Sequence, residues 1–455
     1  MADVYDVIVI GAGPTGENVA ERAVRGGLSA AIVESELVGG ECSYWACMPS
    51  KGLLRPVAAV AEANHVRGVH GARLDSAEVL RRRDKFAHYW KDDSQVEWVK
   101  AAGVDLFRGP GRIAGERVVK VADTELRARH AVVVATGTRA VVPPPVAGVS
   151  PWTSREATSA HAVPATLAVV GGGVVGCEMA AAWSALGTRV TLLARGGLLE
   201  RLPAFAGDLV AKSLREAGVD VRLGADVTGA TRDGDVTLTL ADGTTLEAAE
   251  VLAAAGRAPR TDDLGLESVG LTPGDWLGVD DTMRVAAVDA GWLYAAGDVN
   301  HLALLTHMGK YQGRICGDAI AARAQGQNPT IRDRSSTTCI PQVIFTVPEV
   351  AAVGLTKEQA ESAGYTVRAV DYEIGGVAGA SLYEDGYEGH AQMIVNETTK
   401  TILGMTLAGP GVGEMIHAAT IAVAGEVPLE TLWHAVPSYP TMSELWLRLL
   451  ETYGL

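Results

Sequence analysis

Short apolar runs that end in glycine recur along the chain. The first covers Tyr5–Ile10, and an alanine-rich segment with helical spacing separates it from a second apolar run that ends at Glu34. A buried strand, a glycine turn, a helix and a further strand together make one βαβ unit. Residues 166–195 repeat this plan. The pattern therefore predicts two nucleotide-binding folds in one chain.

Apolar runs elsewhere predict the rest of the organisation. His130–Thr138 is expected to form a buried strand that ends in a glycine turn. Val141–Val149 contains three prolines, which continue neither a helix nor a central strand, so we expect a linker there. Further strands are expected within residues 248–259 and 291–299, followed by a helix over 306–323. From residue 340 onward strands and helices are mixed without another glycine fingerprint, which is typical of a separate α+β domain.

Composition adds the broad class. The 455 residues are enough for about three domains. Acidic residues number 54 against 39 basic ones, so the surface disfavours nucleic acid and anionic membranes as partners. The basic stretch Arg81–Lys85 is expected to be a solvated helix face. No apolar run approaches the roughly 20 residues that span a bilayer, and the acidic N-terminus does not resemble a secretory signal. We therefore expect a cytoplasmic protein.

Cysteine chemistry concentrates in one short loop. Of the five cysteines, Cys42 and Cys47 lie close together, whereas the other three stand apart. A close pair in a reducing compartment indicates metal binding or redox activity. The pair lacks a second ligand pair of matching spacing, which disfavours zinc, and we expect no metal site. Pro49 predicts that a helix begins near Cys47, where the helix dipole would favour the thiolate, and Lys51 follows one turn later.

Two glycine fingerprints follow the predicted strands. Gly11, Gly13 and Gly16 form the first, and Glu34 ends the next strand, where its carboxylate can accept hydrogen bonds from ribose hydroxyls. The second comprises Gly171, Gly173 and Gly176. At the place of the acid it has Arg195, with Arg201 nearby. Guanidinium groups attract a 2′-phosphate, which predicts a preference for NADP over NAD, unless both arginines are simply exposed.

At this point the residues resemble a known family. The stretch Gly39–Lys51, "GGECSYWACMPSK", is similar to the "GGTCxxxGCxPSK" loop of the flavin disulfide reductases, which include glutathione reductase, dihydrolipoamide dehydrogenase and mercuric reductase. The resemblance covers essentially the whole chain. It implies an α/β protein with two Rossmann-like domains, for FAD and for NAD(P), and a C-terminal α+β dimerisation domain. The implied divisions are an FAD-binding domain (1–148), an NAD(P)-binding domain (149–273), a return segment of the FAD or central domain (274–334) and the dimerisation domain (335–455).

The resemblance also implies cofactors and site residues. The positions that match FAD contacts are Gly11, Gly13, Gly16, Glu34, Gly40, Lys51, Gly111, Thr136, Gly137, Gly297, Asp298, Thr306 and His307. Those that match NADPH contacts are Gly171, Gly173, Gly176, Arg195 and Arg201, with NADH the less favoured coenzyme. Cys47 matches the cysteine next to the flavin and Cys42 the interchange cysteine that attacks substrate. Lys51 and Glu178 match a buried ion pair beside the flavin. Hydride would pass from NADPH to FAD, and its two electrons would then reduce the Cys42–Cys47 disulfide.

One departure affects the proton chemistry. The family ends in His-Pro-Thr-x-Ser-Glu, in which the histidine, supplied by the partner subunit, is the base for the interchange thiol and the glutamate orients it. Here the segment is "SYPTMSE", with Tyr439 at the histidine position and Glu444 retained. A phenol has a pKa of about 10 against about 6.5 for imidazole, so tyrosine is a poor base at neutral pH. His434 is expected to have a packing role. Within the cysteine loop, Glu41 replaces the usual threonine and Ala46 the usual glycine.

The sequence thus leaves three functions open. The leading one is a homodimeric FAD enzyme that oxidises NADPH and passes electrons through Cys42 and Cys47 to a small disulfide or another electrophilic acceptor, with the active site shared between subunits. The second is a quinone or metal-ion reductase, similar to mercuric reductase, in which Tyr439 helps to bind the acceptor and no histidine-assisted dithiol relay operates. The third is a flavin-loaded redox sensor or binding protein with negligible turnover.

Overall fold

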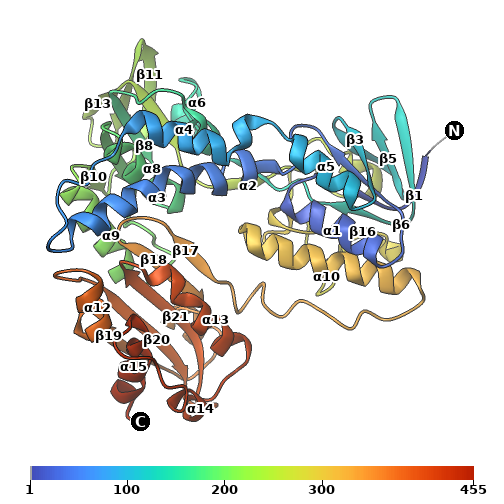
Figure 1. The fold of residues 1–455 in the computed structure, drawn as a ribbon. Coiled ribbons are helices and arrows are strands. Elements are labelled where there is room, and N and C mark those ends of the chain that lie inside the picture. The colour runs from blue at the N-terminus through green and yellow to red at the C-terminus, as the bar shows by residue number, and fades with distance from the viewer. Residues whose placement is uncertain (1–2) are drawn as a thin grey trace. The chain divides into compact units, whose positions relative to one another are not determined.

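The computed structural model describes residues 3–455, and the chain divides into two compact units. The first unit consists of residues up to 49, 84–140 and 257–337, and the second of 50–83, 141–256 and 338–455. Two helices, α3 (Cys47–Asn64) and α4 (Ser76–Phe86), contain the first two of the places where the chain passes from one unit to the other (Figure 1). None of the helices formed by the described residues is long and apolar enough to cross a membrane.

The first unit is built on a mixed sheet of seven strands. Its parallel part contains β3 (Val104–Arg108), β2 (Ala30–Glu34), β1 (Asp3–Ile10), β6 (Thr124–Val134) and, paired with β6, β16 (Leu293–Ala295). The strands β5 (Val118–Val121) and β4 (Gly111–Gly115) extend β6 in antiparallel fashion. A separate two-stranded ladder joins β7 (Thr138–Ala140) to β15 (Arg257–Pro259). The strand β2 is buried along its whole length, as its uninterrupted apolar run predicts.

Helices cover this sheet. Its helices are α1 (Pro14–Arg25), α2 (Gly40–Tyr44), α5 (Asp93–Ala101) and α10 (Thr306–Ala324), with single turns η1 (His88–Trp90), η2 (Leu266–Val269), η3 (Asp289–Gly291) and η4 (Asp298–Asn300). The helices α1 and α10 lie side by side (Figure 1). They approach closely because α10 presents glycines to α1. A Cβ atom on Gly313 would lie 2.7 Å from the carbonyl oxygen of Thr15, and one on Gly317 would lie 2.6 Å from Cβ of Arg22.

The second unit contains the second nucleotide-binding fold. Its parallel sheet has the order β10 (Asp220–Leu223), β9 (Arg189–Ala194), β8 (Thr166–Val170) and β14 (Glu250–Ala253). Beside it lies an antiparallel sheet of β11 (Val227–Asp233), β12 (Asp235–Leu240) and β13 (Thr245–Ala248). The helices are α6 (Pro144–Ala147), α7 (Ser154–Ser159), α8 (Val174–Ala185) and α9 (Ala204–Glu216). The alanine-rich helix α8 is mostly apolar and almost wholly buried, with Glu178 as its charged residue, and it packs in the main apolar cluster of this unit.

The C-terminal part of the second unit is an α+β structure, as its mixed pattern predicts. Five antiparallel strands run in the order β17 (Gln342–Ile344), β18 (Glu349–Gly354), β21 (Thr401–Gly409), β20 (His390–Asn396) and β19 (Val367–Glu373). The accompanying helices are α11 (Lys357–Ser362), α12 (Ala378–Tyr383), α13 (Ile416–Ala424), α14 (Leu429–Trp433) and α15 (Leu445–Tyr453), with single turns η5 (Ile374–Gly376), η6 (Val412–Glu414) and η7 (Met442–Glu444). A separate apolar cluster holds this sheet and its helices together.

Two expectations need correction. The proline-rich linker contains a one-turn helix, α6, because prolines occupy its first positions, where a missing N–H costs nothing. The stretch Arg81–Lys85 is not wholly a solvated face, since Arg83 has no exposed surface. Its guanidinium donates to the carbonyl oxygens of Thr158 (2.6 Å) and Ala160 (2.9 Å). Those carbonyls lie at the end of α7 and leave acceptors that a buried arginine can satisfy.

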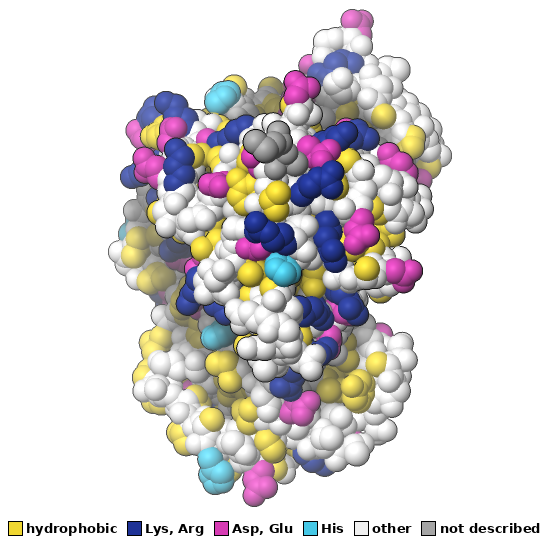
Figure 2. All heavy atoms as spheres, turned by 90° about the vertical axis from the view of Figure 1, so that its right-hand side faces the viewer, with side chains coloured by type: hydrophobic (Ala, Val, Ile, Leu, Met, Phe, Trp, Pro, Cys, Tyr) yellow, Lys and Arg dark blue, Asp and Glu magenta, His cyan; other side chains and the backbone are white. Residues whose placement is uncertain are grey.

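Surface charge is distributed without a dominant sign on the face drawn in Figure 2. Lys and Arg side chains lie there among Asp and Glu side chains. Elsewhere in the described chain, opposite charges form ion pairs such as Arg139 with Asp262, whose side chains are both about half exposed. Exposed pairs of this kind contribute little to stability.

Candidate functional site

The expected site residues divide between the two units. The two cysteines and the residues matched to FAD lie in the first unit, except Lys51. Lys51 and Glu178, the residues matched to the nicotinamide coenzyme, and the C-terminal signature lie in the second unit. Each unit therefore carries one part of the candidate site. Because each unit folds on its own core, its local geometry can be described separately.

The first fingerprint forms a tight turn between β1 and α1. Gly11 has φ of +105°, which is accessible to glycine, and a Cβ on Gly16 would lie 1.9 Å from the carbonyl oxygen of Gly11. Gly13 caps the helix, and the nearest atom to a Cβ placed there is Cα of Gly40 at 4.0 Å. The space beside Gly13 is thus open at the N-terminus of α1. These residues fit a bound diphosphate, which needs close backbone approach and amide donors.

Glu34 is tied to this turn. Its Oε2 accepts a hydrogen bond from the backbone N–H of Ala12 (2.7 Å), and Oε1 accepts one from Glu36 (2.8 Å). Burial raises the pKa of Glu34, while the amide hydrogen bonds oppose that change. The carboxylate lies at the expected end of β2 and retains acceptor capacity for sugar hydroxyls. Its binding role stays a prediction.

Glu17 is a buried acid that the sequence reasoning missed. It lies in the first turn of α1, and its Oε1 is buried without a hydrogen-bond partner among the described residues. Burial raises its pKa to about 7; the Lys310 charge opposes this rise and the Glu34 charge adds to it. Its position directly after Gly16, the last glycine of the fingerprint, is the feature of the sequence that could have pointed to it. An unpartnered acceptor beside the glycine turn is also consistent with a ligand site there.

One expected FAD residue, Asp298, belongs to a hydrogen-bonded network with two residues that were not expected. Asp298 follows Gly297 in η4, and its Oδ2 accepts from the hydroxyl of Thr138 at 3.0 Å. Arg257 Nε donates to the same hydroxyl at 2.9 Å. Burial raises the pKa of Asp298, opposed by that hydrogen bond and by the Arg257 charge. Neither Thr138 nor Arg257 was expected from the sequence. Both flank predicted strands, which gave no indication of their partners.

Other matched positions are placed more simply. Thr136 donates its hydroxyl hydrogen to the carbonyl oxygen of Arg260 at 2.8 Å, and Gly137 has φ of +68° with open space beside it. Gly111 begins β4, where a Cβ would lie 3.0 Å from both Ile10 and Val33 side chains. His307 is exposed in the first turn of α10. The open backbone at Gly137 adds to the fit of an extended cofactor along this edge of the sheet.

The cysteine loop comprises the short helix α2 and the first residues of the long helix α3. Cys42 lies within α2, and α3 begins at Cys47, as Pro49 predicted. Thr306 Oγ1 lies 3.2 Å from Cys47 Sγ, so the start of α10 contacts the pair. Hydrogen bonding with Cys47 and then burial raise the pKa of Cys42, while Thr306 and the Lys310 charge oppose the rise. Cys42 therefore holds its proton at neutral pH, and forming its thiolate requires a base or another change around it.

Glu41, the loop's unusual acid, has a specific partner. Arg260 donates from Nη2 to Glu41 Oε1 at 2.8 Å and from Nε to the carbonyl oxygen of Thr138 at 3.1 Å. Arg260 follows the strand β15 and was not singled out in the sequence. This guanidinium offsets the charge that Glu41 introduces next to Cys42.

The second unit brings Lys51 and Glu178 together. Lys51 Nζ lies 2.9 Å and 3.2 Å from the two carboxylate oxygens of Glu178, whose side chain is 5% exposed. Lys51 comes from α3 and Glu178 from α8, so the contact joins segments far apart in the sequence. The backbone N–H of Phe345 donates to Glu178 Oε1 at 3.0 Å. A nearly buried carboxylate is in this way supplied with a countercharge and an amide donor.

The second fingerprint repeats the geometry of the first. Gly171 has φ of +127°, and a Cβ on Gly176 would lie 1.9 Å from the Gly171 carbonyl oxygen. Nothing lies within 4 Å of a Cβ placed on Gly173. Arg195 follows β9 and is exposed, as is Arg201. These residues fit a dinucleotide with an anionic group near the end of β9.

The two residues singled out in the C-terminal signature, Tyr439 and Glu444, differ in burial. Tyr439 is 76% exposed, whereas Glu444 is buried at the start of α15. Arg448 donates from Nη2 to Glu444 Oε1 at 2.6 Å, and Glu444 Oε2 has no hydrogen-bond partner among residues 3–455. The glutamate thus retains an acceptor, and among the described residues of this chain no imidazole is hydrogen-bonded to it. His434 is exposed at the end of α14.

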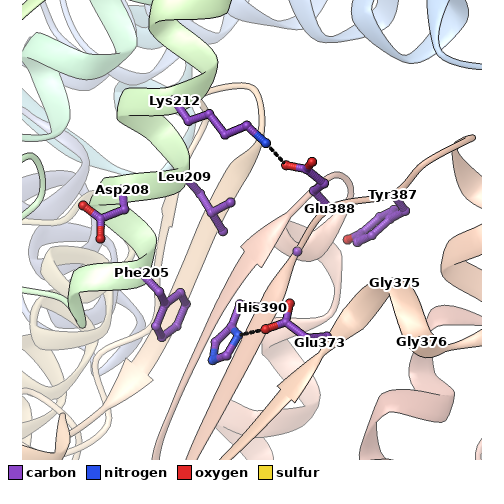
Figure 3. A pocket seen from close by; sticks show the side chains of 11 residues that line it. Phe205, Asp208, Leu209, Lys212, Glu373, Gly375, Gly376, Tyr387, Glu388 and His390 are labelled. Carbon is purple, nitrogen blue, oxygen red and sulfur yellow. Dashed lines mark hydrogen bonds and ion pairs between the residues drawn. The ribbon is translucent and has the colours of Figure 1, made fainter.

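A cavity of about 480 Å³ lies elsewhere in the second unit, between α9 and the β19–β20 connection (Figure 3). His390 contacts Glu373 through Nδ1 (2.8 Å) and Asp371 through Nε2 (3.0 Å). Burial lowers the pKa of His390, but these hydrogen bonds outweigh that effect and raise it overall. None of the expected site residues lines this cavity. Within residues 3–455, no group of three or more His, Cys, Asp or Glu side chains is arranged to hold a metal ion.

Comparison with known proteins places this geometry in a family. Residues 5–326 match the pyridine nucleotide-disulphide oxidoreductase family, and residues 340–449 match its dimerisation domain. The chain is 33% identical to dihydrolipoyl dehydrogenase 3 of Pseudomonas aeruginosa, with 98% of this chain and 97% of that protein covered. It is 31% identical to dihydrolipoyl dehydrogenase of Haloferax volcanii (98% and 95% covered) and 29% identical to mercuric reductase of Staphylococcus aureus (97% and 81%).

Solved structures give the same fold. LpdA from Mycobacterium tuberculosis superposes with a TM-score of 0.84 at 25% identity over 100% of both chains. The Cu(II) complex of the HOCl-induced flavoprotein disulfide reductase RclA from Escherichia coli superposes with a TM-score of 0.84 at 23% identity over 99% of both chains. The chain therefore belongs to the pyridine nucleotide-disulphide oxidoreductase family, with an FAD- and pyridine nucleotide-binding part and a C-terminal dimerisation domain.

Proposed function

We propose that this protein is a homodimeric NADPH-dependent flavoenzyme that passes electrons through Cys42 and Cys47 to a small disulfide or another electrophilic acceptor. The observation that carries the proposal is the thiol pair. The Cys42 thiol in α2 is hydrogen-bonded to Cys47 at the start of α3, and Thr306 Oγ1 lies 3.2 Å from Cys47 Sγ. Two thiols this close can interconvert with a disulfide by a two-electron reaction.

The residues around the first fingerprint would hold FAD. When bound, FAD supplies hydride acceptance from NADPH and passes the electrons on to a disulfide. Backbone amides at the start of α1 would face its diphosphate, and Glu34 would accept hydrogen bonds from its ribose. Asp298, oriented by Thr138, would bind the part of the cofactor that follows the diphosphate.

The thiols would carry out the exchange. Two electrons and two protons convert the Cys42–Cys47 disulfide to two thiols. The Cys42 thiolate then attacks one sulfur of an acceptor disulfide, forming a mixed disulfide and releasing the first thiolate, which takes up a proton. Cys47 attacks Cys42 in the mixed disulfide, reforms the internal disulfide and releases the second product thiol. Lys310 and Thr306 favour the Cys42 thiolate, although the net effect of its surroundings is to raise the pKa.

Arg195 and Arg201 support NADPH as the coenzyme. Both are exposed, and Arg195 directly follows β9, where the second fold would place the 2′-phosphate. The carboxylate of Glu200 in the same loop accepts from the backbone N–H of Gly197 at 2.9 Å, which engages it locally. The relatives called dihydrolipoyl dehydrogenases make lipoamide-type cyclic disulfides one acceptor class to test.

A specific observation favours a second candidate, a quinone or metal-ion reductase. Tyr439 is highly exposed and occupies the position of the family's histidine base. A phenol can donate a hydrogen bond to a quinone or contact a metal ion, but it is a poor base for thiol exchange at neutral pH. In this candidate Cys42 need not turn over.

An anaerobic titration with NADPH tests the leading proposal. We expect a long-wavelength absorbance band from a cysteine thiolate beside the flavin and two new titratable thiols per subunit. Cys42→Ser should abolish disulfide reduction while leaving reduction of the flavin itself. Cys339→Ser, which changes a buried cysteine remote in sequence from the loop, serves as the matched control and should behave as wild type.

The acceptor panel then separates the two candidates. Small disulfides, quinones and metal ions are each assayed with NADPH and with NADH. Retention of quinone or metal-ion reduction by Cys42→Ser, together with negligible disulfide turnover by the wild type, would replace the leading proposal with the second. A higher kcat/KM with NADH than with NADPH would overturn the coenzyme assignment alone.

A further inference from the structure

Phe345 makes two different contacts with the Lys51–Glu178 pair. Its backbone N–H donates to Glu178 Oε1 at 3.0 Å, and its ring lies under the ammonium group of Lys51, with Nζ 4.8 Å from the ring centroid. The residue directly follows β17, so it reaches the pair from a third segment of the second unit. One residue thus contacts both charges.

Burial explains why these contacts matter. The Glu178 side chain is 5% exposed, and its two oxygens receive the Lys51 ammonium and the Phe345 amide. The Lys51 side chain is 35% exposed, and a four-carbon stem gives a lysine ammonium many rotamers unless further contacts restrict it. An aromatic face within about 6 Å attracts an ammonium group through its quadrupole and restricts where the charge can lie.

Phe345 itself is held in place by its neighbours. Thr346 is 1% exposed, and its hydroxyl donates to the carbonyl oxygen of Pro348 at 2.6 Å. Phe345 as a whole is 36% exposed, so its ring is not an enclosed part of the core. The ring contact that the structure gives it is with the Lys51 ammonium, 4.8 Å from the centroid.

We propose that Phe345 is a positioning residue that fixes the Lys51 ammonium over its ring and against Glu178. This inference rests on the proposed function, in which the ion pair acts beside the flavin during reduction by NADPH. The backbone amide of Phe345 is retained whatever the side chain, so substitutions at this position remove the ring contact and leave the amide contact with Glu178. The effect of the ring can therefore be isolated.

Three substitutions separate the aromatic face from apolar bulk. Phe345→Leu keeps much of the volume without the π face, Phe345→Tyr keeps the face, and Phe345→Met serves if the leucine variant does not fold. Stopped-flow reduction of the flavin by NADPH should slow about three- to tenfold in the leucine variant and change less than about twofold in the tyrosine variant. Tyr365→Leu removes a ring that is 40% exposed and contacts neither charge, and it should leave the rate unchanged.

A double-mutant cycle tests whether the ring acts through Lys51. In a Lys51→Met background, Phe345→Leu should have no further effect on the rate, because the ammonium it positions is gone. The midpoint potential of the bound flavin provides a readout other than turnover. Phe345→Leu should shift it in the same direction as Lys51→Met and by a smaller amount, whereas Phe345→Tyr should not shift it.

The outcomes are distinguishable. If Lys51→Met slows flavin reduction but Phe345→Leu matches wild type, or if the two effects simply add, the positioning role is wrong while the proposed function stands. If Lys51→Met itself leaves reduction unchanged, the assigned role of the ion pair fails and the inference fails with it. Slowing of equal size in the leucine and tyrosine variants would indicate a steric role and would also overturn it.

Discussion

At the scale of single residues, burial changes the chemistry of acids that the sequence shows only as charges. Glu17 and Glu34 both lie beside the first glycine turn, yet they differ in partners. Glu34 accepts two backbone N–H groups, whereas one oxygen of Glu17 has none among the described residues. Burial without full compensation raises the pKa of Glu17 to about 7.

This raised pKa predicts a pH-dependent stability. The folded state binds a proton to Glu17 up to about pH 7, but the unfolded state releases it near pH 4.5. The free energy of unfolding is therefore unaffected by the ionisation of Glu17 below about pH 4.5. It decreases as the pH rises from 4.5 to 7, because the unfolded chain ionises more readily, and it stays at the lower value above pH 7. Glu17→Gln should raise the free energy of unfolding at pH 8 by roughly 2–3 kcal/mol and change it little at pH 4.5. Thermal unfolding of the flavin-loaded protein across this range measures the difference.

A matched control is available in the same helix. Glu21→Gln removes an exposed-side acid of α1 that pairs only with Arg25, and it should shift the melting temperature equally little at both pH values. If Glu17→Gln shows no pH-dependent gain over this control, Glu17 is not buried as a charged group in the folded protein.

At the scale of elements, the contact between α1 and α10 joins the cofactor turn to the thiol pair. The turn lies at the start of α1, and Thr306, which contacts Cys47, lies at the start of α10. Glycines on α10 allow the two helices to approach, and Arg22 pairs with Asp318 along the same contact (Nε to Oδ1, 2.7 Å). The spacing of these two helices therefore affects how far Thr306, at the start of α10, lies from the glycine turn at the start of α1.

Adding a methyl group between α10 and α1 should disturb both the packing of the two helices and the glycine turn at the start of α1. A Cβ on Gly313 would meet the backbone oxygen of Thr15 at 2.7 Å, and backbone cannot rotate away as a side chain can. Gly313→Ala should therefore destabilise the first unit by about 1–3 kcal/mol and accelerate loss of FAD on dilution. Calorimetry and flavin fluorescence report the two effects. Gly278→Ala, where no atom lies within 4 Å of the added Cβ, is the control, and equal behaviour of both variants would rule out the packing role.

At the scale of the whole molecule, the dimerisation domain bears on the missing base. The C-terminal part exposes Tyr439 and carries a buried Glu444 with one unpartnered oxygen among the described residues. If the site is shared across a two-fold axis, as we propose, each thiol pair depends on the C-terminal signature of the other subunit.

Mixed dimers test this arrangement. Provided that homodimers of Cys42→Ser and of Tyr439→Ala are each inactive with the acceptor, a hybrid of the two restores one complete site if Tyr439 acts on the partner subunit. We expect a purified hybrid to recover about half of the wild-type rate. Two separately tagged subunits, purified in tandem, give the sample. A hybrid as inactive as its parents would mean that both residues act within one subunit.

The local sequence pattern was sufficient to predict the main helices and strands and the residue types of the candidate site. Apolar runs and glycine turns predicted β1, α1, β2, the second nucleotide fold and α10, because backbone hydrogen bonding and average burial follow short-range periodicity. Pro49 likewise predicted that a helix begins near Cys47. The cysteine loop and both fingerprints predicted the family for the same reason, since their residues lie close together in the chain.

Only the tertiary structure decided which distant side chains meet. The family resemblance implied that Lys51 pairs with Glu178, but nothing local to Phe345 encodes its contact with both of these charges. The same holds for Thr306 beside Cys47 and for Arg83, which the sequence suggested was solvated and which is buried against the end of α7. Periodicity determines which face of an element is apolar, whereas packing of complete elements determines which polar group from afar satisfies a buried charge. The sequence by itself therefore determined the elements, the family and the redox loop, and the packed fold determined the partners that adjust their chemistry.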